Sequence, residues 1–154
     1  VEAAKSRRYG DFGPEAAASA STAMRTALSV MLRLLAPYLS FTCEDVWSWW
    51  QSGSIHRAAW PTHADVLAVS GEDAGAQQAY AMLANALGAI RKGKTDRKVS
   101  VGTGVQSVVY LAPEAEIQAL RRVERDLKAA VRTGALTLSV GEPSVTVTLK
   151  PAEA

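Results

Sequence analysis

The stretch LLAPYLSFTCEDVW, from Leu34 to Trp47, decides how the first third of the chain is organised. Upstream of it lies an alanine-rich run whose apolar residues recur at helical spacing. Pro37 interrupts that run, because proline cannot donate the hydrogen bond that a helix interior requires. Thr42 and Asp45 stand three residues apart, the spacing of a capping box, ahead of further apolar residues. The stretch therefore predicts a long helix, a break and a second helix.

On either side of these two helices the pattern is punctuated by glycine and proline. The first nine residues read as the end of a helix, stopped by Gly10 and Gly13, so we expect the sequence to begin inside an element of a longer protein. Pro14 suits the first turn of the long helix. After the second helix, residues 55–61 read as an extended segment that leads into a loop ending near Gly75.

The second half of the chain mixes helical and strand-like patterns. A helix is expected over about residues 76–91, and another from Pro113 to a stop at Gly134. Short runs with alternating apolar residues indicate strands. These runs are residues 98–101, 105–111, 136–140 and 145–149, joined in two pairs by turns at 102–104 and 141–143. Each pair is expected to form a β-hairpin.

Together these patterns predict an α+β fold. An α-helical bundle is expected over residues 1–62, a linker over residues 63–75, and a small subdomain of two β-hairpins and helices over residues 76–150. With 154 residues, of which 48% are hydrophobic, the chain can bury one or two small cores. No apolar run reaches the roughly 18 residues of a membrane-spanning helix, so no membrane partner is expected.

Charge is segregated along the chain. Residues 40–90 contain five acidic residues and one arginine, a net charge of −4, whereas residues 91–98 contain five basic residues and one aspartate, a net charge of +4. Such a basic cluster is a candidate contact for phosphates, because cationic side chains displace condensed counterions. A solvated helix end, where Lys and Arg favour the negative end of the helix dipole, explains it as well and is favoured on charge alone.

The sequence offers no constellation for catalysis or metal binding. His56 and His63 have a single possible cysteine partner, Cys43, so no zinc site and no internal disulfide are expected. The nucleophile elbow, the phosphate-binding loop and the dinucleotide fingerprint are absent from the sequence. We therefore expect no catalytic residues and no bound cofactor in this chain.

Two clusters have structural explanations that we favour over functional ones. The adjacent acids Glu44 and Asp45 are expected in the first turn of a helix, where the helix dipole stabilises negative charge. Trp47 and Trp50 share one helix face, and Trp49 points elsewhere. Tryptophan on an amphipathic helix is more often part of a core than a platform for RNA bases.

Five segments resemble one family of enzymes. Residues 34–47 resemble the L-x-P-F-x-P-F-x-T-E-E-x-W signature in the anticodon-binding bundle of class I aminoacyl-tRNA synthetases, although Ser40 replaces the usual proline. Residues 54–61, SIHRAAWP, resemble the S-[IV]-H-x-A-x-W-P segment that follows it. Three further segments resemble patterns of the valyl enzymes. Residues 1–9 look like their helix ending E-x-x-K-x-R-x-Y. Residues 90–100 are similar to their I-R-x-x-K-x-x-x-K-V-S stretch, and residues 126–130 are similar to their D-L-x-A-A helix. The chain therefore resembles the C-terminal anticodon-binding region of valyl-tRNA synthetases.

The resemblance implies a role in a cytoplasmic enzyme that attaches valine to its tRNA with ATP and magnesium. The class I motifs H-x-G-H and K-M-S-K-S are absent from this sequence, so the chain is expected to perform no chemistry alone. Its implied partners are valine tRNA and the catalytic domain of the parent chain, and its implied state is a monomer. The coiled-coil arm common in valyl enzymes is expected to be truncated or absent.

Anticodon binding requires groups that stack on unpaired bases and cations that hold phosphates. Such groups are expected at Lys5, Arg7, Arg8, Tyr9, Arg25, Arg33, Arg91, Lys92 and Lys94. A solvated helix face explains Arg25 and Arg33 equally well. Two alternatives remain open: the corresponding region of an isoleucyl enzyme, and a purely structural bundle that packs on its parent enzyme. An exposed apolar patch would favour the structural alternative, and a basic strip from Lys5 to Arg25 would favour tRNA contact.

Overall fold

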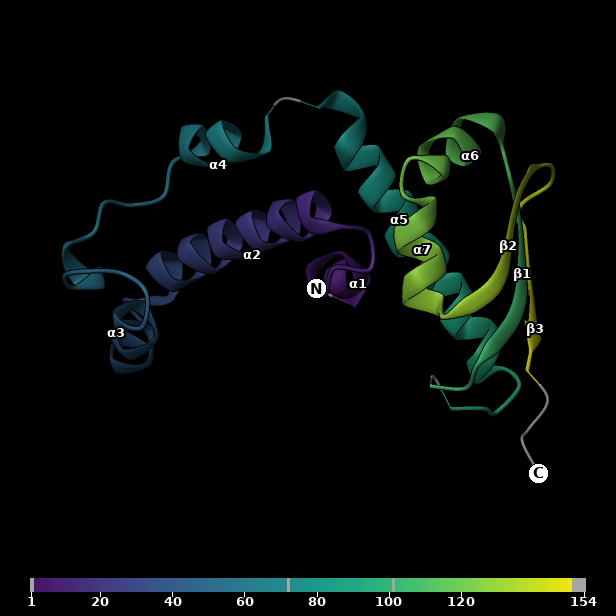
Figure 1. Cartoon of the computed structure of the whole chain (residues 1–154), viewed down its shortest axis with the longest axis horizontal. Coiled ribbons are helices and arrows are strands. Elements are labelled where there is room, and N and C mark those ends of the chain that lie inside the picture. The colour runs from purple at the N-terminus through teal and green to yellow at the C-terminus, as the bar shows by residue number, and fades with distance from the viewer. Residues whose placement is uncertain (1, 72, 101, 151–154) are drawn as a thin grey trace. The chain divides into compact units, whose positions relative to one another are not determined.

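A computed structural model describes residues 2–71, 73–100 and 102–150 of the chain (Figure 1). The chain divides into two compact units: Gly10–Glu72 forms one, and Val1–Tyr9 together with Asp73–Ala154 forms the other. Residues 1–9, which we expected in the bundle over 1–62, therefore belong with the second half of the chain. The physical reason is a pair of charge-assisted hydrogen bonds between Arg7 and Asp126, which fastens the N-terminal segment to a distant helix.

The unit Gly10–Glu72 is helical. Its elements are α2 (Pro14–Leu35), α3 (Ser40–Ser48), the short 3-10 helix η2 (Ile55–Arg57) and α4 (His63–Ser70). Gly13 precedes α2 with a φ of 94°, which glycine adopts without strain. A small core of Leu32, Ala36, Cys43, Trp47 and Ile55 holds α2, α3 and η2 together.

Helix α4 occupies much of the segment expected to be a linker over residues 63–75. Thr62 and Asp65 form a capping box: the Thr62 hydroxyl accepts the Asp65 N–H at 3.2 Å, and the Asp65 carboxylate accepts the Thr62 N–H at 2.9 Å. The capping box expected at Thr42 and Asp45 is wrong, because α3 already begins at Ser40. Both residues therefore lie inside a helix instead of at its start.

The other unit contains the sheet. Its helices are η1 (Glu2–Ala4), α1 (Lys5–Arg8), α5 (Ala74–Thr95), α6 (Glu114–Arg121) and α7 (Glu124–Val131), and its strands are β1 (Val105–Ala112), β2 (Thr133–Val140) and β3 (Ser144–Leu149). The predicted α+β fold is confirmed. The first expected hairpin is wrong, because residues 98–100 form a turn and irregular backbone instead of a strand, with a φ of 56° at Lys98. Residue 101 lies outside the described residues.

The strand order is β2-β1-β3, with β1 parallel to β2 and antiparallel to β3. The second expected hairpin is therefore also wrong, because β2 and β3 lie on opposite sides of β1. Helices α6 and α7 connect β1 to β2, and a helical crossover of this length allows parallel pairing. The chain then crosses the end of β1, where the Gly141 N–H donates to the Ala112 carbonyl at 3.1 Å.

Helices α5, α6 and α7 lie on one face of the sheet (Figure 1). Val108 on β1 is fully buried on this face and is paired in register with Leu136 and Val147 on the two neighbouring strands. From the helices, Leu120 and Leu127 contribute side chains with no exposed surface. This core fixes the ends of α5 and α7, which carry the basic residues discussed below.

Candidate nucleic-acid interface

Helix α1 presents part of the basic group expected at the N-terminus. Lys5, Arg8 and Tyr9 are exposed. Arg7 behaves differently: its Nε donates to Asp126 Oδ1 at 2.5 Å and its Nη2 donates to Asp126 Oδ2 at 2.6 Å. The hydrogen bond from Arg7 to Asp126 raises the pKa of Arg7 further above its ordinary value. Arg7 thus joins α1 to α7, whereas Lys5, Arg8 and Tyr9 are exposed to solvent.

Helix α2 carries Arg25 and Arg33. Arg25 is exposed, whereas Arg33 donates to the Ser29 carbonyl at 3.2 Å and to the Ala59 carbonyl at 3.1 Å. Arg33 therefore ties α2 to the segment after η2. Lys5 and Arg25 belong to different units, so neither unit by itself carries a basic strip that runs from one to the other.

The basic cluster at the end of α5 divides into exposed and buried members. Arg91 and Lys92 are exposed, but only 5% of Lys94 is accessible. Lys94 Nζ donates to the Thr103 carbonyl at 2.8 Å. Burial lowers the pKa of Lys94 below its usual 10.5, and the positive charges of Arg132 and Arg91 lower it further. Lys94 is therefore held as a cation in an unfavourable setting.

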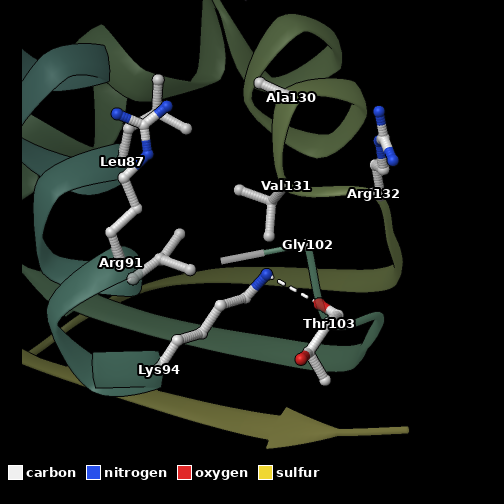
Figure 2. Close-up of a pocket in the computed structure, with 9 residues that line it drawn as sticks. Leu87, Arg91, Lys94, Gly102, Thr103, Ala130, Val131 and Arg132 are labelled. Carbon is white, nitrogen blue, oxygen red and sulfur yellow. Dashed lines mark hydrogen bonds between the residues drawn. The ribbon is translucent and has the colours of Figure 1, made fainter. Parts of the chain in front are cut away.

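A cavity of about 150 Å³ opens beside Lys94 (Figure 2). It is lined by Leu87, Ile90, Arg91, Lys94, Gly102, Thr103, Ala130, Val131 and Arg132. In Figure 2, Arg91 lies on the left and Arg132 on the right, and the Lys94 amine lies lower in the view, where it donates to Thr103. Arg132 was missed by the sequence analysis; its only signal is a basic residue at a helix end directly before Thr133 and Gly134.

Two tryptophans at the C-terminal end of α3 pack in the core of the helical unit, as predicted. Trp47 is buried and its ring centroid lies 5.8 Å from that of Trp50, at 57°, while Trp49 is exposed. Within the described part of the chain, the Nε1–H groups of Trp47 and Trp50 are buried without a hydrogen-bond acceptor. Other exposed aromatic residues of the helical unit are Tyr38, which is 84% accessible, Phe41, which is 92% accessible, and Trp60, which is 61% accessible.

Glu44 has a structural role, but not the one expected. Its carboxylate accepts the Ser54 hydroxyl at 3.1 Å and the Ile55 backbone N–H at 2.8 Å. Glu44 lies beyond the first turn of α3, since that helix begins at Ser40. It therefore joins the two signature segments, residues 34–47 and residues 54–61, instead of stabilising a helix dipole.

The helical unit also exposes an apolar groove of about 620 Å³ between α2 and α4. Val30, Met31, Val66 and Val69 line it, together with small polar residues of α2. Large exposed apolar patches are typical of surfaces that pack on another domain or protein. Among the described residues, no group of three His, Cys, Asp or Glu side chains is placed to hold a metal ion, and no helix is long and apolar enough to cross a membrane.

Comparison with known proteins identifies the family. The family model described as the anticodon-binding domain of tRNA ligase matches residues 1–109. The valine–tRNA ligase of Cutibacterium acnes is 40% identical over 143 residues, which are 92% of this chain and 16% of that protein. The valine–tRNA ligase of Thermobifida fusca is 40% identical over 156 residues, which are 99% of this chain and 17% of that protein. That of Leifsonia xyli subsp. xyli is 39% identical over 141 residues, which are 92% of this chain and 16% of that protein.

The chain therefore spans only 16–17% of the length of these three curated relatives. The family model covers residues 1–109, which include α1, the helical unit and α5 with its basic end. Since this match extends over more than half of the sequence, the chain belongs to the family of anticodon-binding domains of tRNA ligases.

Proposed function

We propose that this chain is the anticodon-binding region of a valine–tRNA ligase and that it docks the anticodon stem-loop of valine tRNA. The observation that carries the proposal is the similarity of nearly the whole chain to valine–tRNA ligases. The longer protein would attach valine with ATP and magnesium at a catalytic domain outside these residues. That domain is then a second partner of this chain, in a monomeric enzyme of the cytoplasm.

The charges of the sheet unit support a role in binding RNA phosphates. Lys5 and Arg8 are exposed on α1, and Arg91 and Lys92 are exposed at the end of α5. Each cation that contacts a phosphate releases condensed counterions, which gives affinity that falls with salt. Arg7 contributes indirectly in this proposal, because its guanidinium is already bound to Asp126.

Readout of unpaired anticodon bases requires flat side chains that are open to solvent. Tyr9 in the sheet unit and Tyr38 and Phe41 in the helical unit meet that requirement. The tryptophans that pack in the core of α3 do not. We therefore assign base stacking to the exposed tyrosine and phenylalanine side chains, and assign Trp47 and Trp50 to the stability of the helical unit.

A second function is favoured by the apolar groove between α2 and α4. Val66 and Val69 are exposed on α4, and Met31 is exposed on α2. Exposed apolar side chains of this number are characteristic of a surface that packs on another domain. In this alternative the helical unit supports the parent enzyme, and RNA contacts lie in other parts of the longer protein.

Binding of the 154-residue chain to transcripts of valine tRNA and isoleucine tRNA distinguishes these possibilities. The proposal predicts a lower Kd for valine tRNA, and it predicts that Arg8→Gln weakens binding more than Arg121→Gln does. Arg121 is a suitable control because it is an exposed arginine of the same unit, on α6. Equal Kd values for the two tRNAs, unaffected by Arg8→Gln, would favour the structural alternative.

A further inference from the structure

The segment over residues 54–61 is fastened to the helical unit near both of its ends. Near its start, the Glu44 carboxylate accepts the backbone N–H of Ile55 at 2.8 Å, and Ile55 is buried in the core of the unit. Near its end, Arg33 on α2 donates to the Ala59 carbonyl at 3.1 Å. The segment is therefore anchored on both sides of η2.

Two flat side chains of this anchored segment are exposed. Trp60 is 61% accessible, and His56 is exposed on η2. Pro61 follows Trp60 directly, and a proline restricts the residue before it to an extended backbone. A large apolar side chain gains free energy when it is removed from water, and tryptophan is enriched at interfaces. An exposed indole on an anchored backbone therefore indicates a contact surface.

A hollow of about 100 Å³ lies beside these side chains. Its lining includes Arg33 from α2, His56 from η2 and Trp60. A cavity of about 150 Å³ holds a benzene ring, so this smaller hollow admits the edge of a flat ring and not the whole ring. The remainder of such a ring would lie against the exposed side chains at the rim.

The charges around the hollow favour a neutral ligand over a phosphate. Arg33 is the single arginine or lysine among the described residues that line it, and its guanidinium already donates to two backbone carbonyls. Hydrogen bonds from Thr62 lower the pKa of Asp65, and the charge of Arg33 lowers this pKa further, so an ionised carboxylate partly balances the arginine. Residues 40–90 carry a net charge of −4. A phosphate would thus meet one balanced cation in acidic surroundings.

We propose that Trp60 and His56 form a binding site for one unpaired base of an RNA strand, on a segment that Arg33 and Glu44 hold in place. The base stacks on the indole, because every base has a flat π-face. Its edge enters the hollow, where the ring nitrogens of His56 can donate or accept a hydrogen bond. The site rests on the proposed function for RNA as the source of the base.

The first experiment uses short oligoadenylate, a single-stranded RNA without a tRNA sequence, as the probe. It is expected to quench the tryptophan fluorescence of the 154-residue chain saturably, and Trp60→Phe should remove this quenching. Trp49→Phe is the matched control, because Trp49 is 71% accessible in the same unit and does not line the hollow. Quenching that persists in Trp60→Phe, or that is absent in the original chain, would overturn the site.

An abasic oligomer of the same length separates a contact to bases from a contact to phosphates. It carries the phosphates without flat rings, so it is expected to leave the fluorescence unchanged. Equal quenching by the abasic oligomer would overturn the site for a base. Quenching of Trp60 by an apolar peptide and not by oligoadenylate would identify a protein partner instead, and would also overturn it.

The second experiment tests the site with valine tRNA transcript. Trp60→Ala is expected to raise Kd about tenfold or more, and Trp49→Ala to leave it within about twofold. Transcripts that lack one anticodon-loop base each are then compared in both backgrounds. Removal of the base that occupies the site should raise Kd in the original chain and have no further effect in Trp60→Ala, because the two changes remove the same contact. Additive effects at every position would overturn the site.

Failure of the proposed function gives a different pattern of results. If a changed anticodon leaves Kd unchanged while oligoadenylate still quenches Trp60, the assignment to valine tRNA fails and the base site remains supported. If the anticodon preference is present while Trp60→Ala binds as Trp49→Ala does, the base site alone is overturned.

Discussion

The guanidinium of Arg7 donates two hydrogen bonds to the carboxylate of Asp126, which lies 119 positions later in the chain. The Asp126 side chain is only 7% accessible, so loss of Arg7 would leave a buried carboxylate without these two donors. The pair joins two of the segments by which the chain resembles valyl enzymes, residues 1–9 and residues 126–130. The presence of Arg7 in this family pattern is thus explained by its structural role, without any contact with RNA.

Removal of Arg7 is expected to destabilise the sheet unit. Arg7→Ala leaves Asp126 buried without its two donors, and we expect a loss of about 1–3 kcal/mol in the free energy of unfolding, the range for a buried polar group left unsatisfied. Arg8→Ala is the matched control, because Arg8 is exposed on the same helix and should change stability by about 0.5 kcal/mol or less. Urea unfolding measures both. Equal losses in the two variants would show that the pair contributes nothing.

Glu44 and Asp45 are adjacent acids with different expected importance. Glu44→Ala removes the acceptor for the Ser54 hydroxyl and the Ile55 N–H, and we expect a loss of about 1–3 kcal/mol. Asp45→Ala removes an exposed carboxylate and should stay within about 0.5 kcal/mol. Thermal unfolding followed by near-ultraviolet circular dichroism reports on the nearby tryptophans. The interpretation of Glu44 as the link between the two signature segments is wrong if Asp45→Ala costs as much.

The capping box of α4 gives a pH-dependent prediction. The Thr62 backbone N–H, with the Thr62 hydroxyl as a second cause, lowers the pKa of Asp65 below its usual 3.8. A carboxylate whose pKa is lowered by folding stabilises the folded state above pH 3.8, and the contribution is lost as pH falls through the lowered value. Thr62→Ala should destabilise α4 by about 1 kcal/mol at neutral pH. Thr42→Ala, inside α3, is the control. Hydrogen exchange of the α4 amides, near neutral pH and below pH 3.8, measures how much each variant destabilises α4.

Lys94 gives a prediction at alkaline pH. Because burial and the charges of Arg132 and Arg91 lower the pKa of Lys94, its ammonium is lost at a pH below the usual 10.5. The unfolded chain holds this proton up to the usual 10.5, so the free energy of unfolding is expected to rise as pH rises from the lowered pKa toward 10.5. Lys92→Gln should keep this rise and Lys94→Gln should remove it, as measured by urea unfolding over an alkaline pH series. The same pH dependence in both variants would exclude Lys94 as the titrating group.

Helix α2 and the break after it could be predicted from sequence because their signals are local. Pro14, Pro37 and the apolar spacing between them identified α2 and the break after it. The strand pairing could not be predicted in this way. Turn residues at 141–143 suggest a hairpin equally well whether the following strand returns beside β2 or crosses to the far side of β1. That choice depends on α6 and α7 covering one face of the sheet, which is a long-range property.

The candidate site was predicted only in part for a similar reason. The basic run from Arg91 to Lys94 was visible as a cluster in the sequence, but the sequence does not show that Lys94 is buried and donates to the Thr103 carbonyl. Arg132 lies 38 positions after Lys94, and no periodicity links the two. Arg7 was expected to contact RNA because it is basic, and its engagement by Asp126 could not be read from either segment alone.

The most direct test of the account is binding of the 154-residue chain to valine tRNA transcript and to the same transcript with a changed anticodon, across a salt series. The account predicts that the anticodon change raises Kd by about tenfold or more, equivalent to about 1.4 kcal/mol, at each salt concentration. Weak binding that is the same for both transcripts and disappears with salt would contradict it, because the contacts would then be electrostatic and without base readout.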